Sequence, residues 1–136
     1  MSNLGNLAEI VDEAARTATA VPQLTIDTPD LTPEDGYAVQ ALAMARRLSR
    51  GEKRVGVKMG LTSRAKMIQV NVEEVIWGRL TDGMRVEEGG FTSMSKYVHP
   101  RVEPEIAFLM GAPLSGDVSA VEAMNAVEAV APAMEI

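Results

Sequence analysis

Two glutamates separated by one residue, Glu103 and Glu105 in the segment VEPEIAFLM, have a spacing that suits metal chemistry. Side chains two residues apart in a β-strand point to the same face, so a strand here places both carboxylates together. Two carboxylates that close repel each other unless a cation lies between them. A hard divalent ion such as Mg²⁺ takes oxygen ligands at about 2.0–2.1 Å, which this pair can supply. The alternative is an acidic strand face turned to solvent, and the spacing alone does not exclude it.

A third carboxylate, Glu135, stands in the apolar segment APAMEI, where an isolated buried carboxylate costs several kcal/mol. If the fold brings Glu135 beside Glu103 and Glu105, the three can hold one ion and leave its other coordination positions to water and substrate. The alternative is a partly exposed glutamate at the end of a strand. Pro104 cannot donate a hydrogen bond to a neighbouring strand, which predicts an edge strand or a bulge there.

Lys58, in the segment VGVKMGLTS, is the candidate for proton transfer. A lysine whose ammonium group lies near apolar walls can take part in acid–base chemistry. The alternative is a strand lysine whose ammonium group reaches solvent. The turn that follows, Leu61, Thr62 and Ser63, offers backbone N–H groups and two hydroxyls that can bind a carboxylate, although this pattern is not specific by itself.

The composition excludes several other kinds of site. The chain has 136 residues, no cysteine, one histidine (His99) and a net charge of −6. Thiolate chemistry and zinc–sulfur sites are therefore excluded, and a site with several histidines is impossible. The negative charge argues against nucleic acid or an anionic membrane as a partner, and an anionic substrate needs a bridging cation. An acidic N-terminal segment and the lack of a long apolar run predict a soluble, cytoplasmic protein.

Helices are expected in the first part of the chain. Apolar spacing predicts one over residues 4–19, followed by an extended connection rich in Pro and Thr. A second helix is expected from Pro33, with Thr32 as its N-cap, to about Gly51.

After Gly51 the sequence turns to short apolar runs punctuated by glycine, which predicts strands. We expect strands at about 54–59, in IWGRL and across KYVHPRVEPEIAFLM, with a short helix over 63–70. Ser119 and Glu122 form a capping box before a helix to about 129, which Pro132 ends, and AMEI begins a further strand. The chain stops inside this apolar strand, so we expect a truncated domain.

Several of these segments occur in an order that is specific to one family: GYAVQ, VGVKMGLTSRAKM, WGRL, HPRVEPEIAF, APLSG and AVEAVAPAMEI. From about Gly36 to Ile136 they resemble the 2-oxopent-4-enoate hydratase / 4-oxalocrotonate decarboxylase family, within the fumarylacetoacetate-hydrolase-like superfamily. The resemblance implies an α+β fold, with an N-terminal helical region over residues 1–51. Residues 52–136 are then the first part of a mixed β-rich roll, similar to the C-terminal domain of fumarylacetoacetase, in a single incomplete domain.

The resemblance also implies which residues act. Glu103, Glu105 and Glu135 match the family's ligands of Mg²⁺ or Mn²⁺, and Lys58 matches its active-site lysine in the motif G-x-K-x-G-L-T-S. The residues Leu61, Thr62 and Ser63 of the same motif are then expected to contact substrate.

The segments KMGLTSRAKM, HPRVEPEIAF and APLSG are closer to the decarboxylase branch than to the hydratases. The implied reaction is metal-dependent decarboxylation of 2-oxo-3-hexenedioate (4-oxalocrotonate) to 2-hydroxypenta-2,4-dienoate in aromatic meta-cleavage catabolism, without an organic cofactor. The alternatives are hydration of 2-hydroxypenta-2,4-dienoate (2-oxopent-4-enoate) and a non-catalytic fragment or subunit of such an enzyme. A homo-oligomer and a partner hydratase are also implied.

Overall fold

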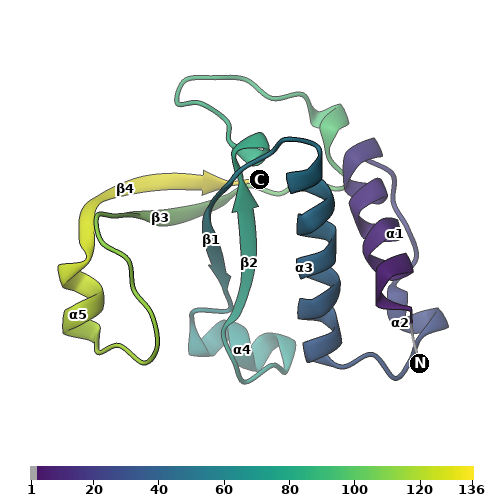
Figure 1. The fold of residues 1–136 in the computed structure, drawn as a ribbon, viewed down its shortest axis with the longest axis horizontal. Helices are drawn as coiled ribbons and strands as arrows, with labels where there is room; N and C mark the ends of the chain where they lie inside the picture. The colour runs from purple at the N-terminus through teal and green to yellow at the C-terminus, as the bar shows by residue number, and fades with distance from the viewer. Residues whose placement is uncertain (1–2) are drawn as a thin grey trace. The chain divides into compact units, whose positions relative to one another are not determined.

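The computed structural model describes residues 3–136, which divide into two compact units, the first ending at Val98 and the second spanning His99–Ile136. Three helices precede the first strand, and the strands form two separate two-stranded antiparallel sheets, one in each unit (Figure 1). This confirms the α+β class expected from the sequence. No helix within residues 3–136 is long and apolar enough to cross a membrane.

Two helices of the first unit, α1 (Leu4–Thr17) and α3 (Pro33–Ser49), lie side by side (Figure 1), and both end within two residues of the predicted positions. The Thr32 hydroxyl accepts a hydrogen bond from the Asp35 N–H, and the Asp35 carboxylate accepts one from the Thr32 N–H. This capping box determines where α3 begins. The connection between the helices was predicted to be extended, and this is only partly correct. Its proline-free middle forms one helical turn, α2 (Leu24–Asp27).

A buried carboxylate ties α1 to α3. Asp12 is only 3% exposed and accepts hydrogen bonds from Nε of Arg46 at 2.9 Å and from both terminal guanidinium nitrogens of Arg50 at 2.7 Å. These hydrogen bonds, those from Arg50 above all, outweigh the opposing effect of burial and lower the pKa of Asp12 to about 2. The buried apolar side chains Ala8, Val39 and Met44 belong to the same two helices.

The lowered pKa of Asp12 predicts an acid-sensitive contribution to stability. Because the pKa of Asp12 in the folded protein lies below its ordinary value of 3.8, ionised Asp12 stabilises the fold above about pH 4, and this stabilisation is lost as the pH falls towards 2. The difference between the pKa of Asp12 in the folded and unfolded protein limits its contribution to the free energy of unfolding to about 2 kcal/mol. Solvent screening reduces it further, since the Arg46 and Arg50 side chains are 40% and 37% exposed.

Urea unfolding at several pH values, compared between the wild type and Asp12→Asn, measures this contribution. We expect the free energy of unfolding to fall more steeply in the wild type below about pH 4. Parallel pH dependences of the two proteins would contradict the assignment to Asp12.

The first sheet pairs β1 (Arg54–Gly60) with β2 (Ile76–Thr81), and α4 (Arg64–Val70) lies in their connection, all close to the predicted bounds. Tyr37 stacks on Trp77 with ring centroids 5.2 Å apart, and the side-chain amide of Gln40 donates to the Trp77 carbonyl. These contacts join β2 to α3. Two short 3-10 helices, η1 (Asp82–Met84) and η2 (Met94–Lys96), follow β2.

The second sheet pairs β3 (Glu103–Met110) with β4 (Val127–Glu135), and α5 (Ala120–Asn125) precedes β4 (Figure 1). The predicted strand across residues 96–110 is confirmed only from Glu103, because His99 adopts a left-handed φ of 50°. The capping box of Ser119 and Glu122 is present as predicted, but the helix ends at Asn125 rather than at about 129.

Pro132 was expected to end that helix, and this was wrong, because Pro132 lies inside β4 opposite Ile106. The segment that follows Ala126 forms a strand because nearly every residue there gains a partner on β3, whereas a longer helix would leave β3 unpaired. Each strand of a two-stranded sheet has a free edge, where a proline is tolerated. The same applies to Pro104 on β3, in agreement with the predicted edge strand.

Candidate metal centre

The pairing of β3 with β4 brings the three predicted glutamates together. Glu103 lies directly opposite Glu135 in the antiparallel register, and Glu105, two residues further along β3, belongs to the same face. One carboxylate oxygen from each residue lies within 4.8 Å of the other two. Glu103 and Glu105 are exposed, and Glu135 is half-buried. The result is a three-carboxylate cluster on one face of the second sheet.

The dimensions of this cluster fit a divalent ion with hard oxygen ligands. Two oxygens at about 2.1 Å from Mg²⁺ lie at most about 4.2 Å apart, and at about 2.4 Å from Ca²⁺ they lie at most about 4.8 Å apart. The observed limit of 4.8 Å therefore requires only a small side-chain rotation to close around the smaller ion. A ligand set made of oxygen alone favours Mg²⁺, Mn²⁺ or Ca²⁺ over softer metals.

Small side chains surround the carboxylates on their own face of the sheet. Ala133 lies opposite Glu105, and Ala107 lies opposite Ala131 at the next position of that face. The opposite face is apolar and carries Pro104, Ile106, Phe108, Val130, Pro132 and Met134. The nearest neighbours of the carboxylates on their own face are therefore alanines.

Lys58, half-buried, lies in β1 of the first unit. The residues two positions away on the same face are Gly56 and Gly60, and Gly78 of β2 lies directly opposite. Lys58 therefore projects from a face of the sheet that carries few other side chains.

The three predicted substrate-binding residues form the loop between β1 and α4. Leu61 has a φ of 56°, a left-handed conformation that is uncommon for a residue with a side chain, and it turns the chain after Gly60. Thr62 and Ser63 are exposed, and the Ser63 hydroxyl accepts a hydrogen bond from the Lys66 N–H at 3.2 Å as the N-cap of α4. Lys58 and this loop belong to the first unit, and the glutamate cluster belongs to the second.

The first unit also contains a polar group that was not predicted from the sequence, formed by Gln40 and Arg79 beside Trp77. The guanidinium carbon of Arg79 lies 4.6 Å from the Trp77 ring centroid, and Arg79 donates a hydrogen bond to the Gln40 side chain at 2.9 Å. The one-turn spacing of Tyr37 and Gln40 on α3 is the signal that could have indicated it.

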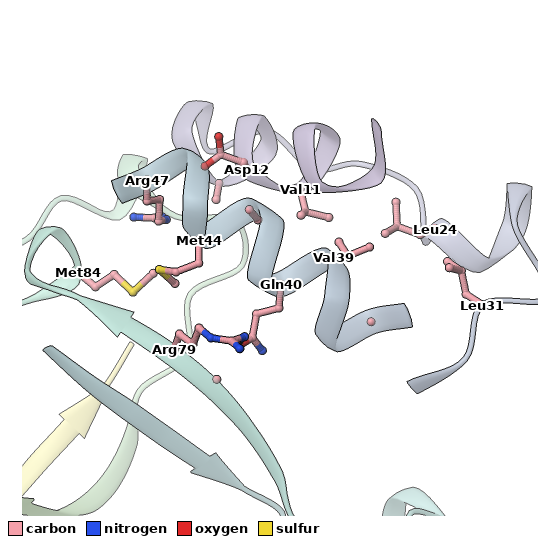
Figure 2. A pocket seen from close by; sticks show the side chains of 14 residues that line it. Val11, Asp12, Leu24, Leu31, Val39, Gln40, Met44, Arg47, Arg79 and Met84 are labelled. Atoms are coloured by element: carbon pink, nitrogen blue, oxygen red, sulfur yellow. The ribbon is translucent and has the colours of Figure 1, made fainter. Parts of the chain in front are cut away.

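This group borders a cavity of about 460 Å³ in the first unit. Figure 2 shows the Gln40 and Arg79 side chains next to each other at the cavity, whose other lining residues include Val11, Leu24, Leu31, Val39, Met44 and Met84. The residues that line it do not include any of the catalytic, substrate-binding or metal-ligand residues predicted from the sequence.

No protein-family model matches the chain. The chain is 53% identical over 133 residues to a 4-oxalocrotonate decarboxylase of Pseudomonas sp, a match that covers 98% of this chain and 52% of the relative. It is 36% identical over 127 residues to a 2-hydroxyhexa-2,4-dienoate hydratase of Comamonas testosteroni, covering 91% of this chain and 48% of the relative.

Among solved structures, the chain is similar to 4-oxalocrotonate decarboxylase from Pseudomonas putida G7 complexed with magnesium and adipate. The TM-score is 0.92 at 39% identity, and the match covers 97% of this chain and 51% of that chain. The same enzyme has also been solved with calcium and acetate.

These matches confirm the resemblance to the hydratase and decarboxylase family over nearly all of this chain. Among these matches, the 4-oxalocrotonate decarboxylases share 39–53% identity with the chain, and the hydratases share 31–36%. The chain is thus more similar to these decarboxylases than to these hydratases. It spans about half the length of the curated relatives it matches.

Proposed function

We propose that this protein acts in the metal-dependent decarboxylation of 2-oxo-3-hexenedioate to 2-hydroxypenta-2,4-dienoate, with Glu103, Glu105 and Glu135 as ligands of Mg²⁺ or Mn²⁺. The observation that carries the proposal is the convergence of the three carboxylates within 4.8 Å, from two strands that are distant in sequence. The 53% identity to a 4-oxalocrotonate decarboxylase supports this reaction over others that use the same kind of metal site.

The substrate class is supported by charge and by the ligand of a relative. With a net charge of −6, the chain is poorly suited to bind a dianion unless a cation offsets the repulsion. The Pseudomonas putida G7 decarboxylase was solved with magnesium and adipate, a dicarboxylate with the same carbon chain length as 2-oxo-3-hexenedioate. A dicarboxylic 2-oxo acid therefore suits a cluster of carboxylates that holds a divalent ion.

Each predicted residue has a role in this reaction. The three glutamates would hold the ion, which would supply Lewis-acid chemistry to the 2-oxo acid end of the substrate. Lys58 binds the dianion or holds the proton that the ketone oxygen takes up when the bond to the distal carboxylate breaks and CO₂ leaves. The hydroxyls of Thr62 and Ser63 and the backbone N–H of Leu61 are proposed to bind a substrate carboxylate.

Further properties expected from the sequence and from the resemblance belong to the same proposal. They are the division into residues 1–51 and 52–136, the fumarylacetoacetase-like roll, a homo-oligomer with a partner hydratase, a cytoplasmic location and a role in aromatic meta-cleavage catabolism. Their support is the sequence identity to the decarboxylases.

Two other functions use the same residues. Hydration of 2-hydroxypenta-2,4-dienoate is favoured by the 36% identity to a dienoate hydratase. Because the chain spans about half the length of its relatives, a metal-binding role without turnover is a candidate of a different class.

An assay of the purified protein with Mg²⁺ or Mn²⁺ separates the three functions. Release of CO₂ from 2-oxo-3-hexenedioate supports the decarboxylase. Loss of 2-hydroxypenta-2,4-dienoate without CO₂ supports the hydratase. If the protein is folded and binds the ion but does neither, the non-catalytic role is correct and the proposed reaction is wrong.

Replacing Lys58 with Met should lower kcat for decarboxylation by about 100-fold, because a positioned acid–base group contributes roughly 10²–10⁴ to a rate. Methionine retains most of the aliphatic length, so the sheet should be preserved. Steady-state kinetics measures the effect, with Lys53→Met as the control, since Lys53 is exposed and lies outside the proposed site. A Lys58→Met variant with kcat close to that of the control would exclude Lys58 from the chemistry.

A further inference from the structure

Gly78 lies inside β2, where glycine is an unfavourable residue. Glycine in a strand loses more conformational entropy than other residues and has no side chain to pack, so it often marks a bulge or a close approach. The backbone does not require glycine here, because its φ is outside the left-handed region. The register is also regular at Gly78, since the irregularity between β1 and β2 lies between Arg54 and Gly56. A close approach is the remaining explanation.

The side chain that approaches Gly78 is that of Lys58. A Cβ atom added at Gly78 would lie 3.2 Å from Cγ and 3.5 Å from Cδ of Lys58. Among the described residues, and apart from the immediate chain neighbours, these are the atoms it would meet within 4 Å. The aliphatic part of Lys58 therefore lies across the bare backbone of Gly78.

The other two glycines on this face have different surroundings. A Cβ atom at Gly56 would meet nothing within 4 Å, and one at Gly60 would lie 2.9 Å from the Ile76 side chain. Of the three, Gly78 is the one whose missing side chain leaves room for Lys58. Gly56 consequently offers a matched control, because it is a glycine in the same pair of strands without this contact.

We propose that Gly78 is a positioning residue for Lys58: it lets the aliphatic part of the lysine lie against β2 and thereby sets where the ammonium group ends. The catalytic meaning of this position rests on the proposed function. A methyl group at residue 78 must displace Cγ of Lys58 by a few tenths of an ångström, and the shift grows along the rotatable bonds towards Nζ. A misplacement of about 1 Å in an active site can cost on the order of 100-fold in rate.

Lysine reactivity tests the positioning without reference to any enzymatic reaction. The chain has four lysines, Lys53, Lys58, Lys66 and Lys96, whose acylation rates by an N-hydroxysuccinimide ester can be followed together by peptide mass spectrometry. In Gly78→Ala we expect the rate at Lys58 to change by about threefold or more while the other three stay constant, because the added methyl displaces only the lysine that touches it. In Gly56→Ala all four rates should match the wild type. An unchanged rate at Lys58 in Gly78→Ala overturns the proposal.

A double-mutant cycle on thermal stability gives a second, independent readout. Alanine has a better strand propensity than glycine, so Gly78→Ala should raise the Tm when residue 58 is alanine. When Lys58 is present, the forced displacement should reduce or reverse that gain, and the difference measures the coupling between the two positions. Equal Tm changes in the two backgrounds overturn the contact.

Decarboxylation kinetics then links the position to the reaction. We expect kcat to fall by about 10-fold in Gly78→Ala with little change in KM for metal or substrate, and to stay near the wild-type value in Gly56→Ala. If the reactivity of Lys58 changes and kcat does not, the positioning by Gly78 stands and the catalytic role proposed for Lys58 is wrong. If both remain unchanged, the positioning itself is wrong.

Discussion

Replacing Glu105 with Gln is expected to weaken Mg²⁺ or Mn²⁺ binding by about 100-fold or more, and to lower decarboxylation in proportion. Glutamine keeps the shape of the side chain but replaces a charged ligand oxygen with a neutral one. Loss of residues that merely orient ligands typically costs 10–100-fold in affinity, so loss of a ligand should cost at least the upper end of that range. Titration calorimetry, or paramagnetic resonance of free Mn²⁺, measures the affinity directly.

In the metal-free protein, the same substitution is not expected to lower thermal stability. Three carboxylates within 4.8 Å repel one another, so removing one charge should leave the metal-free Tm unchanged or raise it, while the rise in Tm on adding metal is lost. Glu103→Gln and Glu135→Gln should behave alike, because all three residues contribute to one cluster. Glu128→Gln is the control, since Glu128 is an exposed residue of β4 outside the cluster. If Glu105→Gln binds metal as tightly as Glu128→Gln, the cluster is not the metal site.

Replacing Asp12 with Ala should lower the free energy of unfolding by about 3 kcal/mol, because charge-assisted hydrogen bonds contribute roughly 1.5–3 kcal/mol each and are not additive. The Asp12 carboxylate is almost fully buried and accepts hydrogen bonds from both Arg46 and Arg50, so its loss leaves Arg46 of α3 and Arg50, the C-cap residue of that helix, without their shared acceptor. The two arginines are partly exposed, so their side chains can turn to solvent when Asp12 is lost. The loss of stability is therefore smaller than it would be if two buried charges were left without a partner. Chemical denaturation followed by circular dichroism measures the change.

Glu9→Ala provides a matched control on the same helix. Glu9 also pairs with Arg46, at 3.3 Å, but its side chain is 62% exposed. An exposed ion pair of this kind contributes between about 0.2 and 1 kcal/mol, so Glu9→Ala should be close to the wild type in stability. A cost of Asp12→Ala no larger than that of Glu9→Ala would show that burial of the carboxylate adds nothing to the attachment of α1 to α3.

Local signals in the sequence were sufficient for most of the elements. The capping boxes at Thr32 and Ser119 involve residues only three apart, so they were recognisable without knowledge of the fold and are present in the structure. The shared face of Glu103 and Glu105 follows from the geometry of a single strand. In contrast, the end of α5 and the strand across Pro132 depend on the partner strand β3, so the local helix signal was misleading there.

Local sequence signals were thus sufficient to place α1, α3, β1 and the strand that carries Glu103 and Glu105, because each depends on neighbours in the chain. The tertiary structure alone decided that Glu135 faces Glu103, since a one-residue shift of β4 would turn its side chain to the opposite face. It also decided that Asp12 is buried against Arg46 of α3 and the C-cap residue Arg50, and that the Lys58 side chain lies against Gly78. Contacts between residues far apart in the chain depend on register and packing, which no local pattern encodes.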